Sequence, residues 1–281
     1  MATIVSLDGV RLNVDEGGVP SGPPILFLHG FSQSLAAWDA QFRGALAARF
    51  RLIRMDLRGH GASAKPETPE SYTESERWAC DVAAVMQALG LVQPILVGWS
   101  YGGYIIADYL RTFGSGNVGG IVLVGGATKK GVPAAKPFGD PAMRPVWSAM
   151  FSDEWTELDA GLREFVRRCS ATPVPPPLFE ALVAANHRAP SYVRRALMAR
   201  QLENDDVLAE IDRPVLIVHG SADAIVLAAA ADHHAAVIPG AQLVWYEGVG
   251  HSPFMEAPDR FDRDLEAFAV AASARAGTVF P

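Results

Sequence analysis

A serine with glycines on both sides is the first residue in this chain whose setting favours chemistry. Ser100 lies in the segment 98–102, of pattern G-x-S-x-G, between an apolar run and an amphipathic one. Such glycines favour a sharp strand-to-helix turn that exposes the serine hydroxyl above a sheet. A serine hydroxyl near neutral pH needs a base to remove its proton before it attacks a carbonyl. An alternative interpretation is that Ser100 only caps the helix. Helix capping alone, however, does not require glycines on both sides of the serine.

The base that this serine requires is predicted to be His251. It follows the last expected strand in a short glycine-containing loop, at the edge of a parallel sheet that faces ligands. Four other histidines are interpreted as structural hydrogen-bonding groups: His29, His60, His187 and His219. His233 and His234 are adjacent on a predicted helix and point in different directions, so they do not form a metal-binding pair, and we expect no metal site.

The carboxylate that would orient the histidine is predicted to be Asp223. It follows the expected strand 215–219 by a few residues, whereas the segment 125–128, after the preceding strand, offers no carboxylate. A carboxylate in this role holds the imidazole in one tautomer and stabilises its positive charge. The competing interpretation makes Asp223 a turn former or a helix cap, because aspartate often follows strands in that role.

Two backbone N–H groups are expected to stabilise the negative oxygen that forms when a carbonyl is attacked. One belongs to Tyr101, which follows the serine, and the other to Phe31, in the loop after the expected strand 25–28. Removing one such donor typically slows a reaction by about a hundred- to a thousandfold. The Phe31 ring is expected to line the substrate pocket.

The elements that must position these residues alternate along the chain. Short β-branched runs separated by amphipathic stretches predict an α/β fold with a mostly parallel sheet and helices on both sides. The expected strands are 3–6, 11–14, 25–28, 51–55, 95–97, 121–124, 215–219 and 243–246, the first two forming an antiparallel hairpin. The expected helices are 35–49, 72–89, 101–113, 229–238 and 258–272.

The alternation breaks after the sixth expected strand. Residues 129–212 contain no convincing strand, several helical stretches and a proline-rich run at 172–177 that predicts a bend. A structureless loop of that length is implausible in a compact domain, so we expect an inserted helical cap, called here the cap segment. Residues 1–128 and 213–281 would then form the core. Trp147, Met150 and Phe151 are expected to line the pocket together with Phe31.

Composition narrows the choice of partners and compartment. The net charge of −7 and the lack of a clustered basic run argue against a nucleic-acid partner. Residues 1–20 hold three acidic side chains and no apolar run, unlike a secretory signal, and no stretch is apolar enough to span a membrane. We therefore expect a cytoplasmic protein, in which Cys80 and Cys169 are free thiols.

Five segments, in this order, resemble the α/β-hydrolase superfamily, in particular its esterases and cofactor-free haloperoxidase-like members. They are 29–31 (HGF), 56–61 (DLRGHG), 98–103 (GWSYGG), 220–223 (GSAD) and 250–253 (GHSP). The resemblance implies an eight-stranded, mostly parallel sheet, a helical cap after the sixth strand, and no metal or organic cofactor. It also makes 56–61 a structural turn, so Asp56 and His60 are left out of the catalytic residues.

These observations predict a serine hydrolase that cleaves small to medium hydrophobic esters through an acyl-enzyme, with Ser100, Asp223 and His251 as catalytic residues. Cleavage of a carbon–carbon bond and perhydrolysis, in which peroxide replaces water, could use the same residues. A ligand receptor on the same fold is a third alternative, because a fold does not dictate a function.

Overall fold

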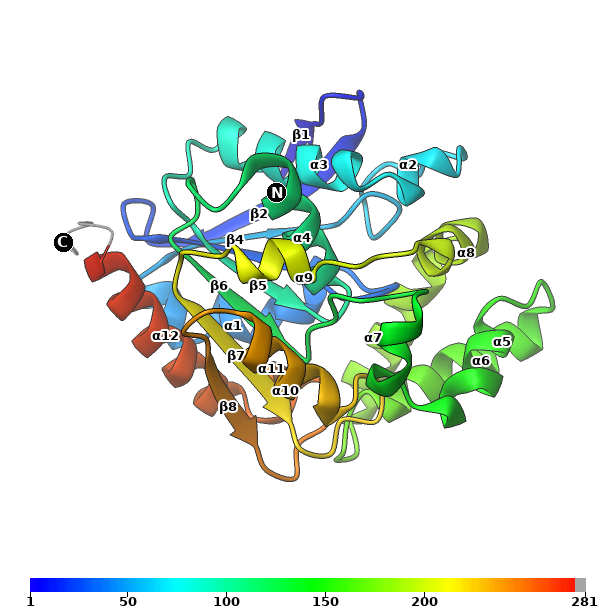
Figure 1. The fold of residues 1–281 in the computed structure, drawn as a ribbon. Coiled ribbons are helices and arrows are strands. Elements are labelled where there is room, and N and C mark those ends of the chain that lie inside the picture. The colour runs from blue at the N-terminus through cyan, green and yellow to red at the C-terminus, as the bar shows by residue number, and fades with distance from the viewer. Residues whose placement is uncertain (276–281) are drawn as a thin grey trace.

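The computed structural model describes residues 1–275, which contain one eight-stranded sheet (Figure 1). Its strands are β1 Ala2–Val5, β2 Arg11–Gly18, β3 Pro24–Leu28, β4 Arg51–Met55, β5 Ile95–Trp99, β6 Gly120–Val124, β7 Val215–Gly220 and β8 Gln242–Tyr246. Their order across the sheet is β1-β2-β4-β3-β5-β6-β7-β8. The β1–β2 and β2–β4 pairs are antiparallel and the remaining pairs are parallel. The mostly parallel sheet and the first hairpin are confirmed.

Helices connect and cover the strands. The described helices are α1 Asp39–Arg43, α2 Glu70–Thr73, α3 Ser75–Ala88, α4 Gly102–Phe113, α5 Arg144–Met150, α6 Trp155–Arg168, α7 Pro176–Arg188, α8 Ser191–Ala199, α9 Asp205–Ala209, α10 Ala228–Val237, α11 Pro253–Glu256 and α12 Pro258–Arg275. Four short 3-10 helices accompany them: η1 Leu35–Trp38, η2 Ala45–Ala48, η3 Pro133–Phe138 and η4 Pro141–Met143.

Two expected helices are broken in the structure. The predicted helix 35–49 is divided into η1, α1 and η2, with extended backbone at Gly44. A Cβ atom there would lie 2.4 Å from Asp262 Oδ2, so α12 packs where a side chain on a continuous helix would project. The predicted helix 72–89 is divided into α2 and α3, and Trp78 Nε1 donates a 3.0 Å hydrogen bond to the Tyr72 carbonyl near this break.

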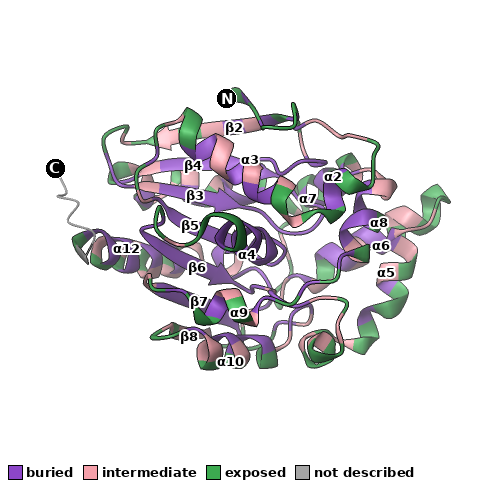
Figure 2. Cartoon of the chain, turned by 45° about the horizontal axis from the view of Figure 1, so that its top comes forward, coloured by how far each residue is buried: buried purple, intermediate pink, exposed green. Residues whose placement is uncertain are grey.

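Alternating side chains fill two cores, one on each face of the sheet. Ile121 and Leu123 belong to the core that includes α3 and α4, whereas Val122 and Val124 belong to the one that includes α12. A period of two is what places successive strand residues on opposite faces. The central strands are buried while the helices expose their outer sides (Figure 2). This buried sheet supports the loops at its carboxyl edge.

The chain between β6 and β7 carries η3, η4 and α5–α9, and within the described residues it adds no strand to the sheet. Helices α5–α8 lie beyond one end of the sheet in Figures 1 and 2. The buried Arg194 of α8 connects this helix to α5 and α7, because its guanidinium donates to the carbonyls of Met150, Asn186 and Ala189. The proline-rich run lies between α6 and α7, where a bend is expected. The division into core and cap segment stays a prediction.

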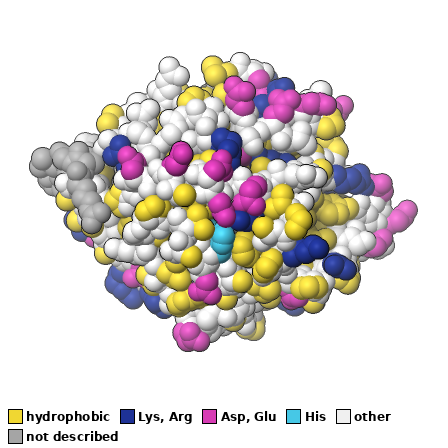
Figure 3. Space-filling model, in the orientation of Figure 1, with side chains coloured by type: hydrophobic (Ala, Val, Ile, Leu, Met, Phe, Trp, Pro, Cys, Tyr) yellow, Lys and Arg dark blue, Asp and Glu magenta, His cyan; other side chains and the backbone are white. Residues whose placement is uncertain are grey.

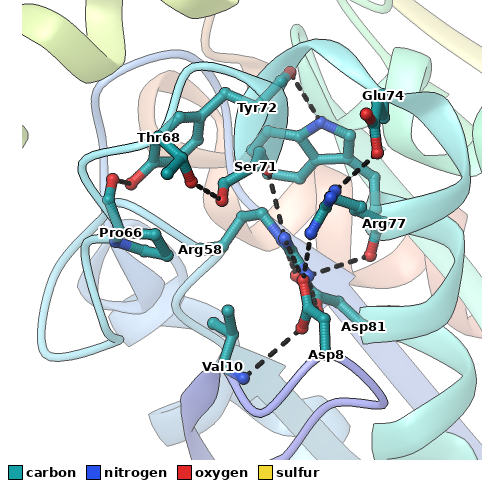
Figure 4. A network of polar contacts seen from close by, with 11 residues as sticks. Asp8, Val10, Arg58, Pro66, Thr68, Ser71, Tyr72, Glu74, Arg77 and Asp81 are labelled. Atoms are coloured by element: carbon teal, nitrogen blue, oxygen red, sulfur yellow. Dashed lines mark hydrogen bonds and ion pairs between the residues drawn. The ribbon is translucent and has the colours of Figure 1, made fainter.

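The segment 56–61 is held by a buried polar network (Figure 4). Arg58, fully buried, pairs with Asp81 on α3 at 2.7 Å and with Asp8 in the β1–β2 turn at 2.8 Å. It also donates to the Ser71 carbonyl at 3.1 Å. Arg58 therefore ties three elements together, which supports the interpretation of this segment as structural.

Asp56 and His60, in the same segment, also bond to backbone. The Asp56 carboxylate accepts from Leu35 N at 2.7 Å and Ala62 N at 2.8 Å. His60 Nδ1 lies 2.8 Å from the Arg58 carbonyl. Burial lowers the pKa of His60 to about 3, so this imidazole is neutral.

On the face drawn in Figure 3, acidic and basic side chains are interspersed among hydrophobic ones. Within the described part of the chain, none of the helices combines the length and the apolar character needed to cross a membrane.

Candidate active site

Ser100 occupies a strained turn between β5 and α4. Its φ of 52° lies in the left-handed region, which costs a non-glycine residue about 1–3 kcal/mol and is found mainly at functional sites. Its N–H donates to the Val124 carbonyl at 2.9 Å, and its carbonyl accepts from Gly103 N at 2.9 Å and Ala127 N at 3.2 Å. These bonds fix the turn independently of the hydroxyl.

The glycines around Ser100 allow strand and helix to approach closely. A Cβ atom at Gly98 would lie 2.8 Å from the backbone of Gly102, and one at Gly102 would lie 2.7 Å from the Leu28 carbonyl oxygen. Both distances are shorter than real Cβ contacts, so larger residues would force the backbone apart. The sharp turn expected from the sequence is present.

His251 and Asp223 form a buried hydrogen bond. His251 Nδ1 lies 2.7 Å from Asp223 Oδ2, while Asp223 Oδ1 accepts from Ile225 N at 2.8 Å and Val226 N at 3.0 Å. Because an ionised carboxylate only accepts, this arrangement places the imidazole proton on Nδ1 and leaves Nε2 as an acceptor. The aspartate is therefore both an orienting partner and the anchor of its own loop.

The loops that carry Ser100, Asp223 and His251 meet around Gly125, directly after β6. A methyl group on Gly125 would lie 3.0 Å from His251 Nδ1 and 3.3 Å from Asp223 Oδ2. Next to Ser100, Trp99 Nε1 donates to the His251 carbonyl at 2.9 Å. Within residues 1–275, however, neither Ser100 Oγ nor His251 Nε2 has a hydrogen-bond partner. The structure thus joins Asp223 to His251 directly, but does not join His251 to Ser100 by a hydrogen bond.

His219, at the end of β7, also contacts Asp223. Its Nε2 lies 2.9 Å from the Val226 carbonyl and 3.5 Å from Asp223 Oδ2. Burial lowers the pKa of His219, so it stays neutral and donates to that carbonyl. His29 has a similar role near β3, since its Nε2 accepts from Leu57 N at 3.0 Å. Both are the structural hydrogen-bonding groups that the sequence predicts.

A cavity of about 240 Å³ opens at Ser100. Phe31, Tyr101 and Trp147 line it, and the backbone N–H groups of Phe31 and Tyr101 have no acceptor among the described residues. The other lining residues are Tyr104, Ala127, Lys129, Lys130, Gly131, Ala135, Phe138, Gly139, Asp140, Met198, Ile225 and Val226. The cavity therefore combines Ser100, two unpaired amides and mostly apolar walls.

Two expected pocket residues do not line this cavity. Met150 is fully buried in the core cluster with Met143 of η4 and Val146 of α5, which lie seven and four residues before it. Phe151 follows the end of α5 and packs against the same cluster from a half-buried position. Only Trp147 of the three faces the cavity, because a short helix directs neighbouring positions to different sides.

Sequence reasoning missed Lys129 and Lys130, which line the cavity just after β6. The signal that could have found them is their position in the loop that follows a parallel strand, at the edge of the sheet that faces ligands. Among residues 1–275, no three His, Cys, Asp or Glu side chains gather as a metal ion would require.

Comparisons with known proteins identify the family and the fold of this chain. Residues 25–264 match the profile of the Alpha/beta hydrolase family. A non-heme chloroperoxidase from Streptomyces lividans is 31% identical, over 95% of this chain and 99% of the relative. A bifunctional esterase/perhydrolase from Acinetobacter calcoaceticus is 27% identical, over 95% and 99%. The crystal structure of an esterase from Rhodococcus sp. ECU1013 has a TM-score of 0.90 and 37% identity, over 96% and 98%.

The profile match spans most of the chain, and the relatives align along nearly their whole lengths. Together with the eight-stranded sheet and the strained turn at Ser100, these matches confirm the resemblance found in the sequence: the chain is an enzyme of the α/β-hydrolase family.

Proposed function

We propose that this protein hydrolyses carboxylic esters, with Ser100 as nucleophile, His251 as general base and Asp223 as the carboxylate that orients the histidine. The observation that carries the proposal is the buried 2.7 Å hydrogen bond between His251 and Asp223, next to a serine held at φ 52° in the wall of a cavity. The esterase and the esterase/perhydrolase among the relatives support the same reaction class.

In the first half-reaction, Ser100 Oγ attacks the ester carbonyl carbon while its proton passes to His251 Nε2. The carbonyl electron pair moves to the oxygen, where the N–H groups of Phe31 and Tyr101 stabilise the negative charge. When the carbonyl re-forms, the bond to the alcohol oxygen breaks and His251 returns its proton to the leaving alcohol. The acyl group remains on Ser100.

In the second half-reaction, His251 takes a proton from water, whose oxygen attacks the acyl carbon. The bond to Ser100 Oγ then breaks, Ser100 regains a proton from His251, and a carboxylic acid leaves. Asp223 remains ionised throughout and stabilises the imidazolium. The proposed substrates are small to medium hydrophobic esters, because the cavity holds about 240 Å³ and its walls are mostly apolar.

Labelling with a fluorophosphonate tests the assignment of Ser100. The wild type should bind the probe covalently and hydrolyse 4-nitrophenyl esters of graded chain length, while Ser100→Ala should do neither because it lacks the attacking oxygen. Circular dichroism checks that the variant is folded. A wild-type protein that remains unlabelled and hydrolyses none of the esters would favour the receptor alternative.

Perhydrolysis is a second candidate, favoured by the bifunctional esterase/perhydrolase among the relatives. A carboxylic acid would first acylate Ser100 with loss of water. Hydrogen peroxide would then attack the acyl carbon in place of water, releasing a peracid and regenerating Ser100. With acetate and hydrogen peroxide, the wild type should form peracetic acid and Ser100→Ala should not. Equal peracid formation by both proteins would show that Ser100 has no part in it.

A further inference from the structure

Two neighbouring lysines line the cavity at Ser100, and they differ in their partners. Lys129 Nζ lies 2.9 Å from Glu203 Oε1 and 2.5 Å from Asp205 Oδ2. Lys130 Nζ contacts the sulfur of Met198 at 3.2 Å and, among residues 1–275, has no carboxylate within 4.0 Å. A thioether sulfur is only a weak acceptor, so the Lys130 ammonium retains hydrogen-bonding capacity.

The backbone holds Lys130 firmly at this place. Its N–H donates to the Leu202 carbonyl at 2.9 Å, and its carbonyl accepts from Leu202 N at 2.7 Å. Gly131, with φ 69°, then turns the chain away. Lys130 is therefore a fixed part of the cavity wall rather than a side chain on a free loop.

The Lys130 side chain is half-buried, so its ammonium is partly desolvated and gains from pairing with an anion. Burial lowers the pKa of Lys130 to about 8, with a smaller effect from the positive charge of Arg200, so most of the side chain is still charged at pH 7. Much of the surrounding wall is apolar. Asp140 also lines the cavity, but its Oδ1 accepts from Ala142 N at 2.8 Å and it forms no ion pair with Lys130. A ligand carboxylate would supply the missing partner.

We propose that Lys130 binds a carboxylate of the substrate, so that the preferred esters carry a carboxylate on the part that enters this cavity. The inference rests on the proposed ester hydrolysis at Ser100 and narrows its substrate class.

Matched pairs of esters test this directly. One series places the carboxylate on the acyl side: the 4-nitrophenyl monoesters of glutaric, adipic and pimelic acid, each paired with a neutral ester in which isopropyl replaces the carboxylate. The other places it on the alcohol side: the acetate esters of 4-hydroxybenzoic acid and 4-isopropylphenol. The readout is the ratio of kcat/KM for the anionic ester to that for its neutral partner, which cancels any difference in folded fraction.

Lys130→Met should lower this ratio by about tenfold or more in at least one series, the size of a lost charged hydrogen bond. Lys130→Arg should keep most of the preference. Lys136→Met, which removes an exposed lysine of η3 that does not line the cavity, should leave the ratio as in the wild type.

A Lys130→Met ratio within about twofold of the wild type in both series, with every ester hydrolysed, would overturn the inference and leave the proposed function standing. A wild type that hydrolyses none of the esters would remove the proposed function, and the inference with it.

Discussion

At the scale of single residues, some buried ionisable side chains of this protein form ion pairs and others do not. Arg200 and Asp108, both buried, form a 2.7 Å ion pair, as do Arg58 and Asp81. Asp262 is buried as well, but among the described residues it accepts a hydrogen bond from Gln41 and forms no ion pair. Such a carboxylate destabilises the fold when it ionises.

Asp262→Asn should therefore stabilise the protein more as the pH rises. Burial raises the pKa of Asp262 to about 6, against the hydrogen bond from Gln41, which lowers it. The folded state thus holds a proton that the unfolded chain releases near its ordinary pKa. The retained proton therefore stabilises the folded state fully below the unfolded-state pKa of Asp262. This stabilisation is lost as the pH rises through about 6. The variant's gain in unfolding free energy should be about 1 kcal/mol larger at pH 8 than at pH 5.

Urea denaturation at the two pH values measures this difference. Asp232→Asn removes an exposed carboxylate of α10. Its effect on the free energy of unfolding should be almost the same at pH 5 and pH 8. An equal gain for Asp262→Asn at both pH values would mean that the Asp262 proton is not retained in the folded state.

At the scale of elements, Glu256 connects the cap segment to the loop of His251. Glu256 Oε1 accepts from Gly250 N at 2.9 Å, and its Oε2 accepts from Ala171 N at 2.9 Å and Thr172 N at 3.2 Å. One carboxylate at the end of α11 thus holds two segments that are distant in sequence. A neutral amide cannot replace it, because one of its two ends donates rather than accepts.

Glu256→Gln should loosen both segments. We expect a loss of about 1–3 kcal/mol in the free energy of unfolding and faster hydrogen exchange at Gly250, Ala171 and Thr172. Glu164→Gln, which removes a carboxylate of α6 that pairs with the exposed Arg167 and the half-buried Arg168, should cost less than about 1 kcal/mol. Unchanged exchange at Gly250 and Ala171 would show that other contacts hold the two segments.

Elements with a strong pattern were predictable from the sequence, and those set by distant contacts were not. The strands follow from β-branched runs, although β2 continues to Gly18 because it pairs with β4 there. The break at Gly44 depends on Asp262, more than two hundred residues later, which no local pattern reveals. The rotation of α5, which buries Met150 and turns Trp147 to the cavity, likewise depends on what it packs against.

At the scale of the whole molecule, the sheet brings together residues that are far apart in the chain. Ser100 follows β5, Asp223 follows β7 and His251 follows β8, and parallel strands place all three loops at one edge. This convergence was predictable because it depends only on strand order and direction. The neighbours of the site in the cap segment were not, since that segment has no motif and its helices are positioned by packing.

One property of the turn after β5 bears on how any reaction at Ser100 would begin. Main-chain bonds to Val124, Gly103 and Ala127 fix the residue, and its hydroxyl takes no part in them. The main chain that carries this oxygen is thus fixed when the polypeptide first folds, and its conformation need not be recreated each time a new ligand arrives. Preorganisation of this kind lowers the entropy lost on approach to the transition state.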